Sequence, residues 1–560
     1  VGHGEVHLRL GMLHRDMGNP EAAVHEWRHL WLEHPGDPAV SMVPDLERTL
    51  PTTFVIPPIT SEHHYQRAER LYRFNRHREA LKAFELARAA APEQGVSDEV
   101  LYHIGTAQYH ARENIAAVAT FRQLFERAPR ASFAPVALLM LARLHLRVEA
   151  DEAFLDTVQV LKAAFPASKQ ADEMSYVLGH FHRNRGRFAE ALQAFRRVAQ
   201  RGNRSEFADD AWWYLGWIQY GLRRYRQATQ TWGKLLRTFP ASPLVPDTLY
   251  WQGRAFERLG RRANAQSRYE WLQTSYRQTY YGYLATARLT GLSPWPWEAR
   301  TVEGDGVVVG TEPSVLEPFP IVPSNAHATR GAELWTMRLF AEAGEELQAV
   351  PADGANALLY HRLAAQAFHW VGEPHRALSI LRRHSRAAIL QAVGLSARDL
   401  QEMTFPLGAL QRLDGVSLDG LDPRFIGALV MAESGWNPRA FSRVGARGLM
   451  QLMPETGHRL AQTLGIHLPS EDQLFDPSLN LRLGIAHVRE LLRRFDHQLP
   501  LAVASYNAGE QEVSQWWARR GDLDVEEFIA NIPFRETRHY VQRVFVYYAE
   551  YQRIYRGRRG

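Results

Sequence analysis

A 37-residue spacing constrains the fold of this 560-residue chain more than any other feature. Small residues recur at this interval, as Gly105, Ala142, Gly179, Gly216 and Gly253. In most copies an aromatic residue follows 16 positions later, namely Phe121, Phe195, Trp232 and Tyr269, and proline follows 24 positions after the anchor at Pro129, Pro166 and Pro240. The pairs Gly11–Trp27 and Ala68–Phe84 extend the series backwards. A fixed period of this length predicts stacked structural repeats.

The residue types within each unit indicate two packed helices. A small residue on the first helix allows close approach, an aromatic residue on the second fills the groove, and proline ends that helix. The pattern resembles tetratricopeptide-type repeats from about Gly11 to Leu289. We therefore expect a mainly α fold with an N-terminal α-solenoid over residues 1–290. Arrays of this kind are usually binding or spacing scaffolds, and the repeat itself names no ligand.

Beyond the repeats, composition divides the remainder of the chain into three segments. Residues 291–326 are rich in Pro and Gly and predict a linker. Helical periodicity resumes in residues 327–400, which predicts a helical linker domain. Residues 401–560 predict a compact C-terminal domain.

Composition and charge exclude several classes of protein. The chain has no cysteine, which rules out disulfides, cysteine zinc sites and thiol catalysis. Its net charge of +5 equals the excess of arginine over glutamate from Arg535 to the last residue, so the remainder is nearly neutral and nucleic-acid binding is not expected. No apolar run is long enough for a transmembrane segment. The first residues lack the pattern of an export signal, so we expect that signal to be absent from this chain.

One segment matches a zinc-peptidase pattern. His25, Glu26 and His29 have the HExxH spacing, and Glu47 is conceivable as a third ligand. However, Trp27 is the packing aromatic residue of the first repeat, which already explains the segment as a repeat helix. We therefore expect no metal and no cofactor.

Glu433 is the strongest candidate for a catalytic group. The apolar residues Phe425, Ile426, Leu429 and Val430 share one helical face, and Glu433 ends that helix just before Ser434-Gly435. Burial beside Met431 and Trp436 would raise its carboxyl pKa, as a general acid near neutral pH requires. The alternative from position alone is a solvated glutamate at a helix end.

Four ordered motifs then suggest a family. They are Glu433-Ser434, the stretch from Ser442 through Gly445-Ala446 to Gly448-Leu449-Met450-Gln451-Leu452-Met453-Pro454, the run Ala504-Ser505-Tyr506-Asn507-Ala508-Gly509, and Ile532 to Arg538 with Tyr540-Val541. Together they resemble the soluble lytic transglycosylases, relatives of goose-type lysozyme that cleave peptidoglycan glycan strands. The resemblance implies a lysozyme-like, mostly helical catalytic domain within residues 401–560. Tyr280 to Ala285 lies where large members of that family end their helical array.

The resemblance also implies a role for each matched residue. Glu433 corresponds to the catalytic acid/base. The positions associated with substrate binding are Ser442, Gln451, Met453, Tyr506 and Glu536, and Ser434 and Asn507 correspond to supporting residues. Gly445, Gly448 and Gly509 are expected to satisfy backbone requirements.

The implied reaction is non-hydrolytic cleavage of the β-1,4 bond from N-acetylmuramic acid to N-acetylglucosamine, giving 1,6-anhydromuramyl products. Glu433 would be the sole acid/base, with no cofactor, although sequence alone leaves Glu536 open as a second carboxylate. The alternatives are a hydrolytic muramidase of the lysozyme type and a repeat scaffold that binds glycan without cutting it. The expected partners are peptidoglycan strands, with cell-wall synthesis or division proteins possible through the repeats, and the expected location is the periplasm.

Overall fold

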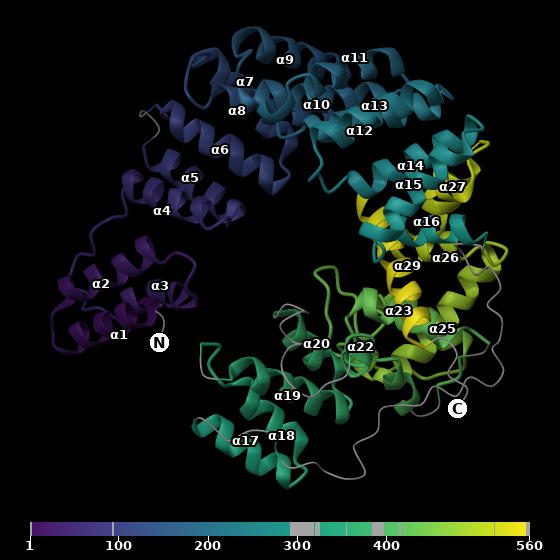
Figure 1. Cartoon of the computed structure of the whole chain (residues 1–560). Helices are drawn as coiled ribbons and strands as arrows, with labels where there is room; N and C mark the ends of the chain where they lie inside the picture. The colour runs from purple at the N-terminus through teal and green to yellow at the C-terminus, as the bar shows by residue number, and fades with distance from the viewer. Residues whose placement is uncertain are drawn as a thin grey trace. The chain divides into compact units, whose positions relative to one another are not determined.

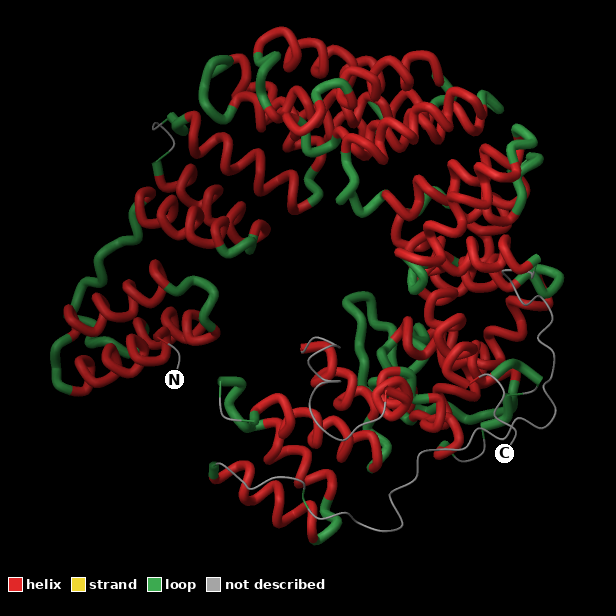
Figure 2. The backbone as a smooth tube through the Cα atoms, in the orientation of Figure 1, coloured by secondary structure: helices red, strands yellow, loops and turns green. Residues whose placement is uncertain are grey.

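The computed structural model describes residues 3–91, 95–291, 319, 325–353, 356–383, 397–413, 416–418, 420–519 and 521–555. These residues are mainly α-helical, as expected, and Figure 2 shows no strand among them. Their only β pairing is two isolated bridges, Phe441–Arg447 and Arg447–Leu452. None of the described helices is both long enough and apolar enough to cross a bilayer. The predicted linker at 291–326 lies almost entirely outside these residues, and the predicted domain boundaries stay predictions.

The chain divides into two compact units, residues 1–248 and residues 249–560. Figure 1 colours the first from purple to blue and the second from teal to yellow. The first unit is built from helical hairpins. Its elements are α1 (His3–Asp16), α2 (Pro20–Glu33), η1 (Pro38–Met42), α3 (Val43–Glu47), α4 (Ser61–Arg73), α5 (His77–Ala90), α6 (Asp98–Ala111), α7 (Asn114–Arg127), α8 (Ala134–Arg147), α9 (Asp151–Ala164), α10 (Lys169–Asn184), α11 (Phe188–Ala199), η2 (Gly202–Arg204), α12 (Ala208–Gly221) and α13 (Tyr225–Thr238), with α14 (Val245–Arg258) beginning at its end.

The predicted small–aromatic pairs make the close contacts of these hairpins. A Cβ atom added at Gly216 would lie 2.2 Å from Trp232 Nε1, and one added at Gly179 would lie 2.7 Å from Phe195 Cε1. Trp232 and Phe195 are completely buried. Because a real Cβ atom cannot approach so closely, glycine is what allows the two helices to pack. The prediction of stacked helical hairpins is confirmed.

The second unit contains the remaining elements. They are α15 (Arg262–Ser275), α16 (Tyr280–Thr290), α17 (Ala326–Thr336), α18 (Phe340–Gln348), α19 (Ala357–Trp370), α20 (Pro374–Arg383), α22 (Ala397–Thr404), η3 (Leu407–Arg412), α23 (Pro423–Glu433), α24 (Pro454–Thr463), η4 (Glu471–Phe475), α25 (Pro477–Arg494), α26 (Leu499–Ala508), α27 (Glu510–Ala518), α28 (Val525–Ala530) and α29 (Arg535–Tyr555).

The hairpin of α17 and α18 repeats the geometry of the first unit. A Cβ atom added at Gly331 would lie 2.7 Å from the side chain of Leu347, which follows 16 residues later. Leu347 is fully buried in the core shared with Tyr360 and Phe368 of α19. The sequence predicted renewed helical periodicity here but not this repeat-like pair, because leucine replaces the aromatic residue.

The C-terminal helix α29 contacts many of the helices at the C-terminal end of the second unit. It packs against α16, α22, α23, α26 and α28. The tyrosines Tyr540, Tyr548, Tyr551 and Tyr555 are buried, so one side of α29 packs into the domain. This helix therefore brings residues near position 540 to the end of α23.

Within the second unit, buried charged side chains link α14 and α16 to the segment around α28. Tyr250 on α14 donates a hydrogen bond to Glu526 Oε2 over 2.6 Å, and Arg288 on α16 lies 2.9 Å from both Glu526 oxygens. Arg254 pairs with Glu526 and, over 2.5 Å, with Asp524. The side chains of Arg254 and Glu526 are only 4% and 6% exposed. Burial acts to raise the pKa of Asp524, but Arg254, the Glu527 backbone N–H and Arg258 together outweigh burial, and that pKa is lowered.

Candidate active site

Helix α23 places Glu433 at a sharp turn. The Asp422 side chain caps the helix by accepting the backbone N–H of Arg424 over 2.9 Å, and Pro423 occupies the first turn. Glu433 is the last residue of the helix. The chain then passes through Gly435 and Trp436, which both have positive φ, at 57° and 67°. A non-glycine residue in this region is strained, so packing of the buried Trp436 indole, whose Nε1 donates to Tyr551 over 3.0 Å, must hold the turn.

The Glu433 carboxyl group lies in an environment that favours its protonated form. Burial raises its pKa to about 7, against an ordinary value of 4.5. Two groups act in the opposite direction: the Tyr540 hydroxyl, which donates a hydrogen bond to Oε1, and the positive charge of Arg543. No carboxylate among the described residues contributes to this shift. Burial thus acts on the pKa of Glu433 in the direction that the sequence predicts.

Tyr506 on α26 completes the group around Glu433. Its pKa is raised well above 10 by burial and, secondly, by the charge of Glu433. The Tyr506 hydroxyl donates to the Met450 carbonyl over 2.7 Å. Three separate helices thus bring one carboxyl group and two tyrosines together. Tyr506 therefore lies near Glu433 in this structure, and its role in substrate binding stays a prediction.

The loop before α24 is fixed by polar side chains that bind its backbone. Gln451, which has φ of 48°, donates through Nε2 to the carbonyls of Ala440 and Gly448 over 3.0 and 2.9 Å. Ser442 Oγ accepts the Ala446 N–H over 2.9 Å. Gln451 and Ser442 therefore shape the loop, and their contact with a saccharide stays a prediction.

Asn480 on α25 binds the backbone of the same loop. This residue was not identified from the sequence. Its side chain is fully buried. Oδ1 accepts the Met450 N–H over 2.8 Å, and Nδ2 donates to the carbonyls of Arg447 and Leu474 over 2.9 and 2.7 Å. This amide replaces the hydrogen bonds that the buried loop backbone would otherwise lose.

Glycine is required at the predicted positions. Gly445, Gly448 and Gly509 have φ values of 95°, 79° and 89°. At Gly448 a Cβ atom would also lie 2.3 Å from the Leu474 carbonyl oxygen, so both conformation and space exclude a side chain. The expectation of a backbone role for these glycines is confirmed.

The remaining predicted site residues lie around this centre in different settings. Met453 is 40% exposed at the start of α24, and Glu536 is exposed in the first turn of α29. Asn507 Oδ1 accepts the Thr537 hydroxyl over 2.7 Å, which links α26 to α29. Ser434 Oγ donates to the Val430 carbonyl over 3.2 Å and so closes the end of α23. Substrate binding by Met453 and Glu536 stays a prediction.

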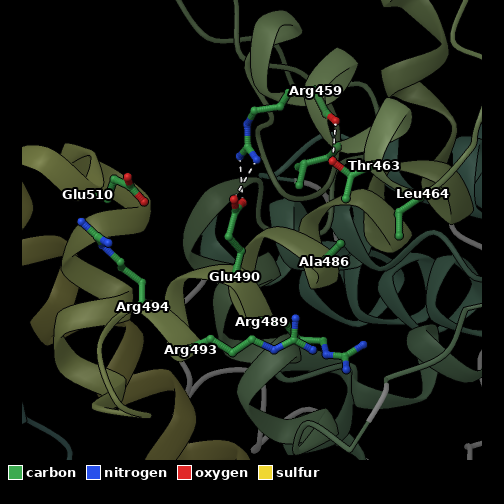
Figure 3. A pocket seen from close by; sticks show the side chains of 10 residues that line it. Arg459, Thr463, Leu464, Ala486, Arg489, Glu490, Arg493, Arg494 and Glu510 are labelled. Atoms are coloured by element: carbon green, nitrogen blue, oxygen red, sulfur yellow. Dashed lines mark hydrogen bonds and ion pairs between the residues drawn. The ribbon is translucent and has the colours of Figure 1, made fainter.

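A pocket of about 640 Å³ lies elsewhere on this domain, between α24, α25 and α27 (Figure 3). None of the predicted site residues lines it. Arg459 and Glu490 face each other across it and form two hydrogen bonds of 2.8 Å, while Arg489, Arg493, Arg494 and Glu510 complete its charged lining. Its charged side chains thus pair partly with one another.

Comparison with protein families identifies the catalytic segment. Residues 417–529 match the family "Transglycosylase SLT domain", and residues 210–242 and 247–279 match "Tetratricopeptide repeat". A Haemophilus influenzae relative is 42% identical over 145 residues, which cover 26% of this chain and 23% of its own length. The soluble lytic murein transglycosylase of Escherichia coli K12 is 38% identical over 127 residues, or 22% of this chain and 20% of its own. The matches thus span less than a quarter of these curated relatives.

The solved structures extend the likeness to the fold of nearly the whole chain. An inactive variant of lytic transglycosylase Slt from Pseudomonas aeruginosa, in which glutamine replaces a glutamate, aligns with 98% of this chain and 81% of its own. The TM-score is 0.57 and the sequence identity is 22%. Residues 417–529 are thus similar to the transglycosylase SLT domain, and the fold of nearly the whole chain is similar to that of this solved structure.

Proposed function

We propose that this chain is a peptidoglycan lytic transglycosylase. It cleaves the β-1,4 bond between N-acetylmuramic acid and N-acetylglucosamine, and Glu433 serves in turn as acid and base. The observation that carries the proposal is the half-buried Glu433, whose carboxyl pKa is raised to about 7 by burial, is lowered by Tyr540 and Arg543, and is affected by no described carboxylate. The names of the relatives that share the domain support the same substrate class.

The first chemical step requires a proton donor at neutral pH. A carboxyl group with a pKa of about 7 is protonated in a substantial fraction of molecules there, whereas an ordinary glutamate is not. Glu433 gives its proton to the glycosidic oxygen as the bond from muramyl C1 to that oxygen breaks. The N-acetyl group of the same sugar helps to stabilise the cationic centre at C1.

The second step uses the carboxylate formed in the first. Glu433 takes the proton of the muramyl 6-hydroxyl while O6 bonds to C1, which yields a 1,6-anhydro ring and restores the protonated acid. No water molecule is consumed. An attacking group within the bound sugar has a large effective concentration, worth several kcal/mol relative to a separate reactant.

The structure favours this route over hydrolysis through a pair of carboxylates. Retaining glycosidases place two carboxyl groups about 5–5.5 Å apart, where each strongly affects the other's pKa. The charges that act on Glu433 include only Arg543 among the described residues. Glu536, which the sequence left open as a second carboxylate, is exposed on α29 and is not among the groups that shift the Glu433 pKa.

Tyr540 provides the test of this proposal. Release of soluble fragments from purified peptidoglycan sacculi should fall as pH rises through about 7, because the acid loses its proton. The Tyr540 hydroxyl lowers the pKa of Glu433, so Tyr540→Phe should move that fall to higher pH. The measurement is the initial rate of fragment release by each variant over pH 5–9, a range of about two units on either side of that pKa.

Tyr548→Phe is the matched control, because it removes a second buried tyrosine hydroxyl of α29. That hydroxyl donates over 2.8 Å to Asp422, at the other end of α23 from Glu433. Its profile should keep the wild-type midpoint. Identical shifts in the two variants would contradict a direct action of Tyr540 on Glu433.

The proposed substrate also suggests where the protein is located and what its repeats bind. The substrate proposed for the catalytic domain is the glycan strand of the cell wall, so we propose a periplasmic location. The repeats would contact long strands or cell-wall synthesis and division proteins. Chemistry resides in residues 401–560 in this proposal.

A further inference from the structure

Three histidines of the first hairpin lie together in the first unit. His7 is on α1, His29 is near the end of α2, and His34 is the residue that caps α2. One ring nitrogen from each lies within 4.8 Å of the other two. The ring centroids of His7 and His29 are 4.4 Å apart, and that of His34 lies 5.8 Å from His7 and 6.3 Å from His29. The cluster lies far along the chain from the catalytic motifs.

The close packing of α1 and α2 creates this arrangement. A Cβ atom added at Gly11 would lie 2.2 Å from Trp27 Nε1, and that nitrogen donates to the Leu8 carbonyl over 3.2 Å. The fixed contact places His7 opposite His29. His34 is held at the end of the helix, where its backbone N–H donates to the Leu30 carbonyl.

Glu26 orients the first of the three rings. Its Oε2 lies 2.7 Å from His7 Nδ1, which leaves His7 Nε2 as the nitrogen that can bind an ion. A histidine that binds a metal typically donates its other ring N–H to a carboxylate in this way. The HExxH geometry is not formed, because the His25 side chain is 78% exposed and Glu47 pairs with Arg28 over 2.8 Å.

The hairpin of α17 and α18 contains the same histidine–carboxylate pair without the other two histidines. His327 and Glu346 on α17 and α18 occupy the same repeat positions as His7 and Glu26, and the contact distance is also 2.7 Å. At the position equivalent to His29 the chain has Ala349. The histidine–carboxylate pair is thus a recurring packing feature, and the two added histidines distinguish the first hairpin.

We propose that His7, His29 and His34 form a binding site for one zinc-type divalent transition-metal ion. Imidazole nitrogens suit Zn²⁺, Co²⁺, Ni²⁺ and Cu²⁺ better than they suit Mg²⁺ or Ca²⁺. Zinc–nitrogen bonds of about 2.0–2.1 Å in tetrahedral geometry require a small inward movement of the rings and leave one position for water. His29 is exposed, so the ion can enter from solvent.

The ion would join α1 to the end of α2. This inference is independent of the proposed glycan chemistry, because none of its residues belongs to the catalytic domain.

The test measures ion binding to the full chain after chelation and buffer exchange. We expect one Zn²⁺ per chain by equilibrium dialysis, and Co²⁺ should give the absorption of a low-symmetry, four- or five-coordinate complex. His29→Ala should abolish that absorption. Glu26→Gln should weaken binding by about 10–100-fold, as is typical when the carboxylate behind a ligand is lost.

Two variants serve as matched controls. His25→Ala removes an exposed histidine of the same helix, and His327→Ala removes the equivalent histidine–carboxylate pair, so both should bind the ion as the wild type does. Circular dichroism checks that each variant is folded. Absence of a bound ion in the wild type, or unchanged binding by folded His29→Ala, would overturn the proposal.

Discussion

Glu433→Gln is expected to reduce glycan cleavage by at least about 10²–10⁴-fold, the usual contribution of general acid–base catalysis. Glutamine has nearly the same shape and can still accept the Tyr540 hydrogen bond, but it cannot donate and recover a proton. The measurement is the initial rate of muropeptide release from purified sacculi. Circular dichroism of both proteins establishes that the helical fold is unchanged.

Glu455→Gln is the matched control for this substitution. Glu455 is an exposed glutamate in the first turn of α24, on the same domain. Its removal should leave the rate within about twofold, since surface substitutions away from special features are nearly neutral. A folded Glu433→Gln protein with near-normal turnover would contradict the role of Glu433 as the catalytic acid and base.

Glu433→Gln should also change how the stability of the protein depends on pH. The folded pKa of Glu433, about 7, exceeds its ordinary value of 4.5. The protonated carboxyl group therefore favours the folded state fully below pH 4.5, and this contribution is lost as pH rises through about 7. Because glutamine does not ionise, the melting temperature of Glu433→Gln relative to the wild type should be higher at pH 8 than at pH 5.

Glu526→Gln is expected to lower the free energy of unfolding of the second unit by about 3–5 kcal/mol, as breaking a buried ion pair typically does. The change removes the negative charge that faces Arg254 and Arg288, and the Arg254 side chain is only 4% exposed. Urea denaturation would measure the loss. Hydrogen exchange should locate it in α16, α28 and the part of α14 from residue 249 onward.

Glu490→Gln provides the comparison with an exposed pair. Glu490 makes two hydrogen bonds of 2.8 Å to Arg459, and these side chains are 45% and 49% exposed. Exposed pairs contribute about 0–1 kcal/mol, so this variant should remain close to the wild type. Equal losses in the two variants would show that burial of Glu526 has no special effect.

The Glu526 network also bears on where the catalytic part can be cut. A fragment of residues 401–560 lacks Arg254 and Arg288, the partners of Glu526, and Tyr283, which donates to the buried Glu550. A fragment beginning near residue 249 keeps all of these contacts. We therefore expect the longer fragment to be the more stable carrier of Glu433-dependent cleavage.

The sequence predicted those contacts that form between neighbouring helices of one repeat. Gly216 and Trp232 are 16 residues apart, and the contact between them depends only on two consecutive helices. The packed face of α23, with Glu433 at its end, could also be predicted, because both lie within a single helix. Periodicity contains this kind of information directly.

Contacts between distant segments could not be predicted in the same way. Tyr540 reaches Glu433 across 107 residues, and Tyr250 reaches Glu526 across 276. The sequence identified Tyr540 only as a motif residue, with nothing to show that its hydroxyl faces the acid. The histidine cluster was missed for a related reason, since HExxH spacing directs attention to His25 and the actual neighbours of His29 come from α1 and the end of α2.

The chemical form of the released fragments tests the central claim most directly. Purified sacculi would be digested by the wild-type chain and by Glu433→Gln, and the products analysed by mass spectrometry before and after borohydride treatment. The account predicts Glu433-dependent fragments lighter by one water than hydrolysis products, with muramyl ends that borohydride does not reduce. Fragments of the hydrated mass with reducible ends would contradict it and identify a hydrolytic muramidase.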